Sequence, residues 1–259
     1  MSSVTFLGTG GGRLVVLNQL RRSGGFWLKL DGINILQDPG PGCLVMIHRH
    51  RLKPVALDAI ILSHRHIDHS NDINVLIEAM TGGGFQTRGR LIVPGDCLDD
   101  DPVILRYVRP FTQITEIKEG MKISLGDIKI EFPIRNMHPV ETYGAIYEFG
   151  GKKLGYIPDT EYFPGLAEAY RGVDFLILNV VRMKTDRRIR HLNIDEAKDL
   201  IDEIKPKKAI LTHFGLQVLK ASPEFQAKLI SEKTGIKVLA AYDGMTANLE
   251  ESENLEKWI

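Results

Sequence analysis

Short apolar runs rich in β-branched and aromatic residues, separated by glycine and proline, set the pattern along most of this chain. They occupy 4–8, 26–30, 33–37, 59–62, 90–94, 121–134, 143–149, 153–157, 174–178 and 209–212. Runs of this length and composition, bounded by turn-forming residues, are typical of β-strands. The pattern therefore predicts a chain rich in short strands.

Three segments instead favour helices. Apolar residues recur at helical spacing over 70–80, and further helices are predicted over 193–204 and 222–235. Asn193 can cap the second helix, while Glu196, three residues later, completes a capping box. The third helix begins with a serine followed by proline and ends at a glycine, which is the usual asymmetry of helix ends.

Strands precede helices in both halves of the chain, and no linker-like or low-complexity stretch separates the halves. Strands and helices in this order favour an α/β fold, in which helices cover the outer faces of mixed sheets. We therefore predict one layered domain over residues 1–259, with two mixed β-sheets between outer helices.

Composition narrows the class of protein. The 43% hydrophobic and 25% charged residues are those of a globular domain, and the formal net charge of zero argues against a uniformly basic surface for nucleic acid. Cys43 and Cys97 form no C-x-x-C pair, which favours a reducing compartment and argues against a thiolate zinc site. Without a leader-like start or an 18-residue apolar stretch, the expected location is the cytoplasm, with no membrane span. The oligomeric state stays open, a homodimer included.

The segment SHRHIDH, residues 63–69, carries the densest candidate chemistry. His64, His66, Asp68 and His69 lie within six residues, directly after an apolar run. Imidazole and carboxylate groups suit borderline divalent metals, so four such donors predict a metal site that holds two ions. Because the first two histidines precede the predicted helix, we expect the segment to form the turn between a strand and that helix.

Further donors follow other predicted strands. His138 comes after the run at 129–134, Asp159 after LGYIP, and His213 after the run at 209–212. The ends of these strands would bring the three side chains to one rim of the sheets, and a carboxylate there can bridge two cations. Together with SHRHIDH they supply the number of donors that a two-metal site needs.

The sequence resembles the metallo-β-lactamase superfamily of metal-dependent hydrolases. The motifs that carry the resemblance are, in order along the chain, GTGGG, the aspartate of LQDPGPG, SHRHIDH, His138, YIPDT and LTHFG. The resemblance spans nearly the whole chain and implies a four-layer αββα sandwich with the metals at one edge of the two sheets. One position departs from the pattern: Asp72 stands where many members have glycine, which puts the backbone at the entry to the following helix in question.

The resemblance also implies roles for the donors. One metal would be held by His64, His66 and His138, and the second by Asp68, His69 and His213, with Asp159 bridging. Two divalent ions are thus expected, with zinc first and manganese or iron(II) also compatible with this donor set. Asp68 would double as the base that orients the nucleophile. Asp38 would either accept a hydrogen bond from a metal-bound imidazole or cap a turn.

His191, in RHLNIDEA, resembles an extra histidine of the phosphodiesterase branch, which contains tRNase Z and the cyclic phosphodiesterase associated with carbon-phosphorus lyase. An imidazole there can stabilise phosphoryl oxygens or protonate a departing alkoxide, and the alternative is that it only flanks the helix cap. A basic run precedes it, either as a solvated face or as an approach for phosphate: Arg182, Lys184, Arg187, Arg188 and Arg190.

The expected reaction is hydrolysis of a small or cyclic phosphodiester, or of a short nucleotide, by attack of a metal-bridging hydroxide. tRNA is not the expected substrate, because only residues 139–158 separate His138 from Asp159, where tRNase Z carries a long arm. The alternative is hydrolysis of a thioester or lactone by the same centre. A di-iron redox protein and a metal-free interaction protein are disfavoured, since no motif histidine is replaced by glutamate and all seven ligands are present.

The sequence leaves alternatives open for three further residues. Asp243, in AYDGM, is expected either near the site or in a simple Asp-Gly turn. His48 and His50 are expected at the surface, or as contacts to a substrate phosphate. The glycine loop GTGGG is expected to form a tight turn after the first strand, because a dinucleotide fingerprint would need glycine where the chain has Arg13.

Overall fold

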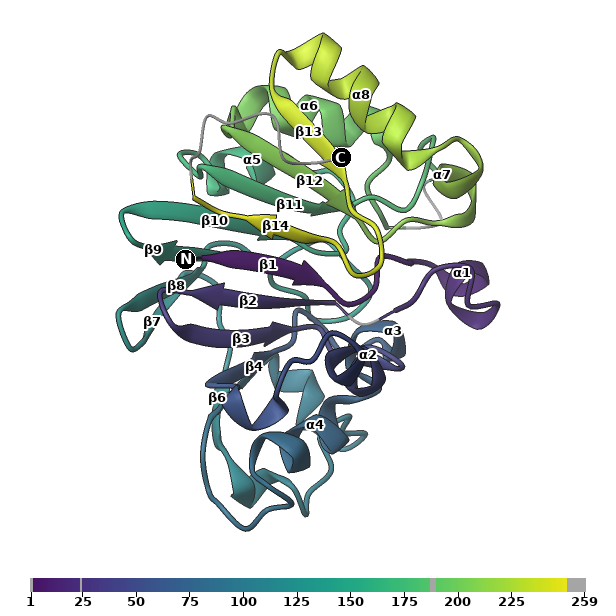
Figure 1. Cartoon of the computed structure of the whole chain (residues 1–259). Helices are drawn as coiled ribbons and strands as arrows, with labels where there is room; N and C mark the ends of the chain where they lie inside the picture. The colour runs from purple at the N-terminus through teal and green to yellow at the C-terminus, as the bar shows by residue number, and fades with distance from the viewer. Residues whose placement is uncertain (1, 24, 187–189, 251–259) are drawn as a thin grey trace.

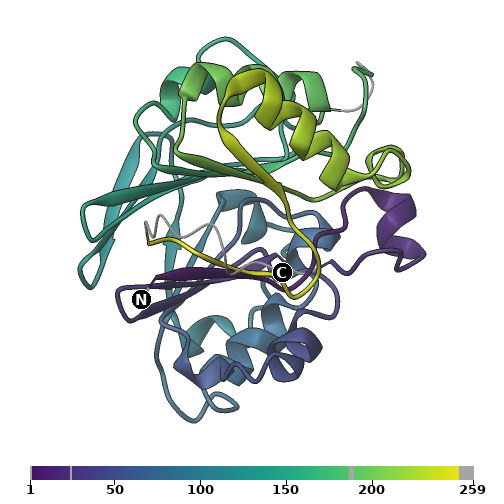
Figure 2. The same ribbon diagram turned by 45° about the horizontal axis from the view of Figure 1, so that its top comes forward.

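Two seven-stranded β-sheets lie face to face in the computed structural model, which describes residues 2–23, 25–186 and 190–250 (Figures 1 and 2). Helices cover the outer face of each sheet (Figure 1). The order of strands is β14-β1-β2-β3-β4-β5-β6 in the first sheet and β13-β12-β11-β10-β9-β8-β7 in the second. The described residues therefore form the αββα sandwich that the sequence predicts.

The strands are short in both sheets. Those of the first sheet are β1 (Ser3–Phe6), β2 (Phe26–Leu30), β3 (Ile33–Gln37), β4 (Ala59–Ile61), β5 (Arg90–Val93), β6 (Gln113–Glu116) and β14 (Thr246–Asn248). Those of the second sheet are β7 (Met121–Leu125), β8 (Ile128–Phe132), β9 (Ala145–Phe149), β10 (Lys152–Ile157), β11 (Phe175–Asn179), β12 (Lys208–Thr212) and β13 (Lys237–Ala240).

The helices of the described residues are mostly short as well. They are α1 (Arg13–Leu17), α2 (Cys43–Arg49), α3 (Ile67–Ser70), α4 (Ile73–Met80), α5 (Leu166–Ala169), α6 (Ile194–Ile204), α7 (Leu216–Lys220) and α8 (Pro223–Thr234), with 3₁₀ turns at Pro54–Ala56, Gly95–Cys97 and Arg109–Phe111. None of these helices is long and apolar enough to cross a membrane.

Each sheet is antiparallel in one half and parallel in the other. The pairs from β3 to β6 are parallel, as are those from β10 to β13. Parallel strands finish at the same edge of their sheet, and loops that carry ligand-binding groups commonly gather at this edge. SHRHIDH follows β4, while Asp159 and His213 follow β10 and β12. The predicted ligands therefore gather at one edge of the sandwich.

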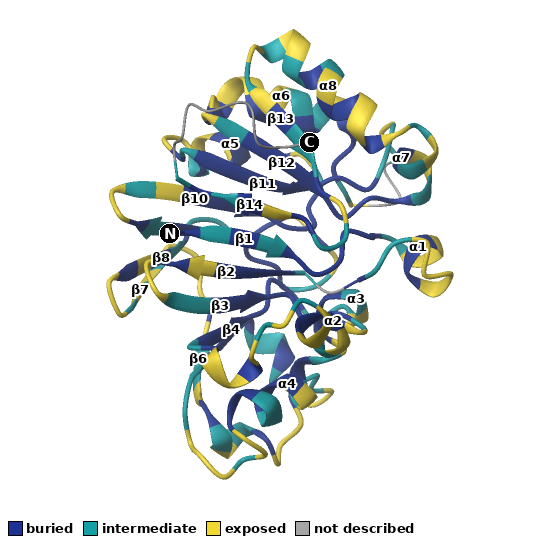
Figure 3. Ribbon diagram, viewed as in Figure 1, coloured by how far each residue is buried: buried dark blue, intermediate teal, exposed yellow. Residues whose placement is uncertain are grey.

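Three apolar layers hold the sandwich together. Ala59 and Ile61 of β4 face the layer between the sheets, while Ile60 faces the layer under α2 and α4. In β11, Ile177 points between the sheets and Leu176 points to the layer under α5, α6 and α8. Central strands are thus buried on both faces (Figure 3), which explains why they appear in the sequence as continuous apolar runs.

The two best-marked helices are confirmed. The side chain of Asn193 accepts hydrogen bonds from the backbone N–H groups of Asp195 and Glu196 at 2.9 and 3.0 Å, and the carboxylate of Glu196 accepts one from the N–H of Asn193 at 3.0 Å. The third predicted helix begins after Ser222, whose hydroxyl accepts from the N–H of Phe225. This side-chain capping satisfies amide groups that the first turn of a helix leaves without partners.

Two sequence predictions were wrong in detail. The helix expected over 70–80 begins later, as α4 at Ile73, and a separate short helix, α3, precedes it, so Asp68 and His69 lie on a short helix and not in a turn. The run at 121–134 is not one strand but the hairpin β7–β8, because Gly126, with φ 57°, allows the chain to reverse. The pattern also missed β6, β13, β14, α1, α2, α5 and α7.

Candidate metal centre

The structure brings all seven predicted ligands together, and His191 with them. Four overlapping groups have their donor atoms within 4.8 Å of one another: His64, His66 and His138; His64, His69 and Asp159; Asp68, His69 and His213; and His138, Asp159 and His191. Since the groups share members, they form one continuous cluster at the edge of the two sheets.

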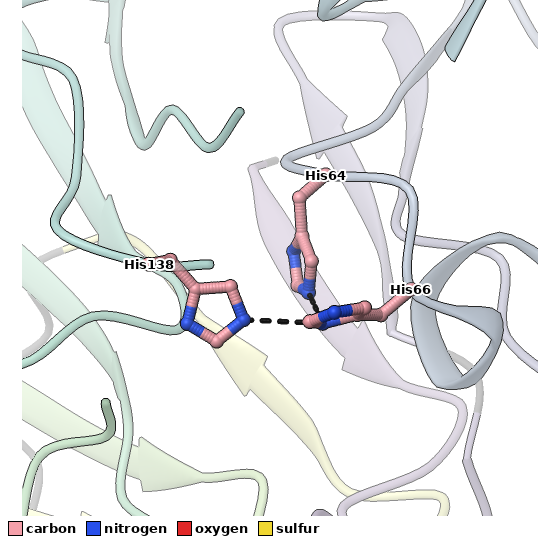
Figure 4. A group of neighbouring side chains, drawn as sticks. All are labelled: His64, His66 and His138. Carbon is pink, nitrogen blue, oxygen red and sulfur yellow. Dashed lines mark hydrogen bonds between the residues drawn. The ribbon is translucent and has the colours of Figure 1, made fainter. Parts of the chain in front are cut away.

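Three imidazoles converge in the first group (Figure 4). Nδ1 of His66 lies 3.1 Å from Nε2 of His64 and 3.1 Å from Nε2 of His138. Nitrogen ligands placed 2.0–2.1 Å from a tetrahedral zinc ion are separated by about 3.3 Å. Both separations are therefore close to what one such ion requires.

Hydrogen bonds behind the rings decide which nitrogens carry protons. The hydroxyl of Ser63 donates to Asp38 at 2.7 Å, so it accepts from Nδ1–H of His64 at 2.9 Å. The carbonyl oxygen of Arg190 can only accept a hydrogen bond, so Nδ1 of His138, 3.1 Å away, must carry the proton and donate it. Both Nε2 atoms consequently present lone pairs to Nδ1 of His66, whose single proton could satisfy only one of them. A cation at this position would satisfy all three nitrogens.

The second group is held around the carboxylate of Asp68. Its Oδ2 lies 3.5 Å from Nε2 of His213 and 4.0 Å from Nε2 of His69. His213 has a left-handed backbone, with φ 59°, an uncommon conformation for a residue other than glycine that often accompanies functional sites. This strained position aims the ring into the cluster at the end of β12.

Asp159 stands between the two groups. Its Oδ2 lies 3.5 Å from Nε2 of His69 and 3.9 Å from Nε2 of His64, and its Oδ1 lies 3.4 Å from Nδ1 of His213. The carboxylate is 2% exposed, so a buried charge lies at the midpoint of the cluster. Its two oxygens therefore face histidines of both donor groups.

Several buried nitrogens of the cluster have no hydrogen-bond partner among the described residues. They are Nε2 of His69, Nδ1 of His191 and both ring nitrogens of His213. A buried polar atom without a partner costs about 1–3 kcal/mol, so a folded protein rarely leaves several together. Imidazole nitrogens and carboxylate oxygens in this arrangement fit one or two divalent cations.

Asp38 lies behind the cluster and accepts several hydrogen bonds. Its carboxylate accepts from the N–H and hydroxyl of Ser63 at 2.6 and 2.7 Å, from the hydroxyl of Tyr156 at 2.8 Å and from Nδ1 of His69 at 3.1 Å. With its Nδ1–H bonded to Asp38, a neutral His69 would turn the lone pair of Nε2 toward Asp68 and Asp159. Of the two roles open for Asp38, the geometry favours that of an acceptor that orients a ligand histidine.

Burial and charge set opposite protonation preferences within the metal-free cluster. Burial, helped by neighbouring histidines, lowers the pKa of His64 well below its usual value and that of His138 to about 4. Burial acts in the same sense on His69 and His191, but the carboxylate of Asp159 outweighs it and raises the pKa of both rings. Neutral imidazole is the form that binds metal, so the first group is already in its binding state at pH 7.

His191 enters the cluster from the loop before α6. Its Nε2 donates to Oδ2 of Asp159 at 3.0 Å, and its ring centre lies 5.2 Å from that of His138. The side chain is 18% exposed, so it borders both the buried cluster and solvent. The sequence left open whether this residue only flanks the helix cap, and the structure places it against the predicted bridging carboxylate.

Asn179 is a residue of the centre that sequence reasoning missed. Its Nδ2 donates to Oδ1 of Asp159 at 2.9 Å and lies 3.3 Å from the hydroxyl of Tyr156. Asp159 therefore accepts a hydrogen bond from Asn179 on Oδ1 and one from His191 on Oδ2. The available signal was the place of this asparagine directly after the predicted strand at 174–178, next to the strand that precedes His213.

The glycine loop after β1 packs against the cluster. A Cβ atom on Gly11 would lie 2.2 Å from Nδ1 of His213, so only glycine fits there. Asp243 holds the same loop: it accepts from the N–H and hydroxyl of Thr9 at 2.9 and 2.7 Å and from the N–H of Arg22 at 2.9 Å. Asp243 therefore fixes a loop beside the centre and is absent from the candidate ligand groups of the described residues.

The remaining candidates lie outside the cluster. Asp72 accepts from the N–H of Leu44 at 3.1 Å, which ties the start of α2 to the break between α3 and α4 and explains a carboxylate at that position. His48 is exposed on α2, and His50 packs against Gly244. Of the basic run, Arg187 and Arg188 lie outside the described residues, and Arg190 contributes its carbonyl to His138.

The chain matches known proteins over most of its length. The family model described as Beta-lactamase superfamily domain matches residues 33–214, a span that contains all seven predicted ligands. An uncharacterized protein of Methanocaldococcus jannaschii, MJ1374, is 30% identical over 254 residues, which are 95% of this chain and 94% of the relative.

Solved structures agree on the fold. The metallo-beta-lactamase fold protein YhfI from Bacillus subtilis superposes with a TM-score of 0.82 at 21% identity, covering 96% of this chain and 100% of that chain. A diphosphatase from the PhnP family superposes with a TM-score of 0.70 at 22% identity, covering 95% and 97%. The fold implies divalent metal binding, and the chain belongs to the beta-lactamase superfamily.

Proposed function

We propose that this protein is a dinuclear-metal-dependent hydrolase that cleaves a small or cyclic phosphodiester or a short nucleotide. The observation that carries the proposal is the placement of Asp159 between two donor groups, with His191 hydrogen-bonded to the same carboxylate at 3.0 Å. The first ion would be held by His64, His66 and His138 and the second by Asp68, His69 and His213, with Asp159 shared between them.

Two bound divalent ions would supply a nucleophilic water with a lowered pKa and would neutralise charge on the phosphoryl group. The protein supplies orientation and proton transfer. The Asp68 side chain is 20% exposed, so this carboxylate can both hold an ion and accept a proton from an incoming water. Asp38 and Asn179 hold His69 and Asp159 in place from behind.

His191 is the residue that favours a phosphodiester over a carbonyl substrate. Cleavage of a phosphodiester expels an alkoxide, which needs a proton, and an imidazole at the edge of the cluster can donate one from Nε2. The structural similarity to a diphosphatase of the PhnP family supports phosphorus chemistry of this kind.

The chain between His138 and Asp159 favours a small substrate. Residues 139–158 contain β9 and β10, which pair with each other as a hairpin of the second sheet. This interval therefore adds no arm beside the cluster that could grip a folded RNA. A compact phosphodiester needs only the cluster and its rim.

The test is a comparison of substrates on the metal-loaded protein. Bis(p-nitrophenyl) phosphate and a 2′,3′-cyclic nucleotide should be hydrolysed faster than an acyl thioester or an acyl lactone, measured side by side as kcat/KM. Activity on the acyl compounds alone would overturn the phosphodiesterase assignment and leave thioester or lactone hydrolysis by the same centre. Failure to hydrolyse either class would overturn the hydrolase assignment of the site.

A further inference from the structure

A groove with positively charged walls lies next to the candidate metal centre. Its volume is about 680 Å³, and it is bordered by the segment after β11 and by α7: Arg182, Lys184, Thr185, Asp186, Gln217 and Lys220. Three of these residues carry positive charge and one carries negative charge, in a chain whose formal net charge is zero. The cations are therefore concentrated locally.

Both walls of the groove are formed by chain segments that leave the strands next to the cluster. β11 and β12 run parallel, with Asn179 opposite Thr212, so the chain leaves both strands at the edge where the ligands gather. One wall begins three residues after Asn179, and the other begins four residues after His213. The segments that lead into the two walls lie against each other near the cluster, because a Cβ atom on Gly215 would lie 2.2 Å from the carbonyl oxygen of Val181.

The first wall is fixed to the same helix start that positions His191. The carbonyl of Arg182 accepts from the N–H of Ile194 at 3.0 Å, and the hydroxyl of Thr185 accepts from the side chain of Asn193 at 2.9 Å. Nη2 of Arg182 bonds to Asp186 at 3.1 Å, which holds the guanidinium in place. His191 and this wall therefore form one unit, and the groove has a defined position relative to the cluster.

The charges available to a ligand come mainly from the two lysines. Lys184 and Lys220 are exposed, on opposite walls, and neither has an ion pair with another residue in the described ranges. The only carboxylate of the lining, Asp186, is bonded to Arg182. Lysine ammonium groups on two sides of a groove favour a compact anion, and phosphate is such an anion.

We propose that this groove, named here the basic groove, binds a second phosphate group of the substrate while the scissile phosphodiester lies at the metal centre. This inference rests on the proposed function and narrows the substrate class to phosphodiesters that carry a further phosphate, such as a 5′-phosphorylated nucleotide. A neutral or singly charged diester would use the centre without the groove.

A matched pair of substrates tests the kinetic consequence on the metal-loaded protein. We expect adenosine 2′,3′-cyclic phosphate bearing a 5′-phosphate to be hydrolysed with kcat/KM about tenfold above that of the compound without it, because charge-assisted contacts to phosphate are among the stronger ones. In Lys184→Gln/Lys220→Gln this ratio should fall toward one. The control Lys228→Gln, on the outer helix α8, should keep the wild-type ratio. An unchanged ratio in the double variant would overturn the groove assignment.

A binding measurement separates this proposal from the proposed function. Calorimetric titration of the metal-loaded proteins with adenosine 3′,5′-bisphosphate should show weaker binding to the double variant, by about tenfold, and unchanged binding to Lys228→Gln. Equal dissociation constants for the three proteins would contradict the groove even if both cyclic compounds are cleaved. If neither compound is cleaved but the double variant binds more weakly, the phosphodiesterase proposal fails and the groove stands.

Discussion

Nδ1 of His69 lies 3.1 Å from Oδ2 of Asp38, and the same carboxylate holds Ser63, which in turn holds His64. One buried aspartate thus orients a histidine of each proposed metal site, directly in one case and through a hydroxyl in the other. Asp38 is 1% exposed, and every contact to its side chain comes from a donor. The arrangement requires a charged acceptor.

Asp38→Asn should therefore weaken metal binding by about 10- to 100-fold, as is typical when a partner of a ligand histidine is changed. The amide N–H groups of asparagine would face other hydrogen-bond donors. The hydrogen bonds that orient His69 and His64 would then be lost, and both rings could rotate. Affinity can be measured by competition with a chromophoric chelator. Asp127→Asn, in the exposed turn of the β7–β8 hairpin, is the matched control. Equal affinity in the two variants would show that Asp38 does not orient the ligands.

Gly11→Ala should lower the metal content of the protein. The added Cβ would lie 2.2 Å from Nδ1 and 2.4 Å from the carbonyl oxygen of His213, so the whole residue must shift and its ring must move away from Asp68 and Asp159. Gly32→Ala is the control: no atom lies within 4 Å of its Cβ, but its φ of 92° makes alanine unfavourable by about 1 kcal/mol. Elemental analysis should show a loss of metal for the first variant only, while thermal unfolding reports the effect of the second. Full metal content in Gly11→Ala would contradict the placement of His213.

His191→Ala should reduce phosphodiester turnover by about 100-fold or more, in the range expected for loss of a general acid, while metal content changes little. Metal content should change little because His191 is hydrogen-bonded to Asp159 and is not one of the residues proposed to hold the two ions. His48→Gln, at an exposed position of α2, should leave turnover unchanged. Parallel losses of metal and turnover in His191→Ala would instead make this histidine a ligand or a structural element.

The buried state of His138 predicts a pH dependence of the metal-free protein. Burial lowers the pKa of His138 from 6.5 to about 4, so between these values the unfolded chain binds the proton more readily than the folded one. The stabilising contribution of neutral His138 is therefore complete above about pH 6.5 and is lost as the pH falls toward 4. The difference in free energy of unfolding between wild type and His138→Gln should shrink over this interval in urea titrations. A constant or growing difference would contradict the burial of a neutral ring.

Much of the fold could be predicted because the central strands are buried on both faces. The continuous apolar run at 174–178 identified β11, and Asn193 with Glu196 identified the start of α6, since both signals are local. The break between α3 and α4 could not be predicted, because it depends on Asp72 bonding to Leu44, a residue 28 positions away. Edge strands such as β6, with half-exposed or exposed side chains, carried too little apolar pattern to be recognised.

The candidate site was predictable to the extent that its residues follow strands. His138, Asp159 and His213 were found in this way, and the structure gathers them with SHRHIDH. The supporting contacts were not predictable, because they depend on distances between strands: the carbonyl of Arg190 on His138, and Asn179 on Asp159. A carbonyl group has no sequence signal, and an asparagine at the end of a strand has many roles.

The most direct test of the dinuclear centre is the metal content of the protein purified without added metal, measured by elemental analysis against accurate protein concentration. The two donor groups and the shared Asp159 predict about two equivalents of divalent metal per chain, with zinc as the expected ion. His64→Gln and His213→Gln should each lower this content. One equivalent or less in the wild-type protein, unchanged after incubation with zinc and desalting, would contradict the two-metal account.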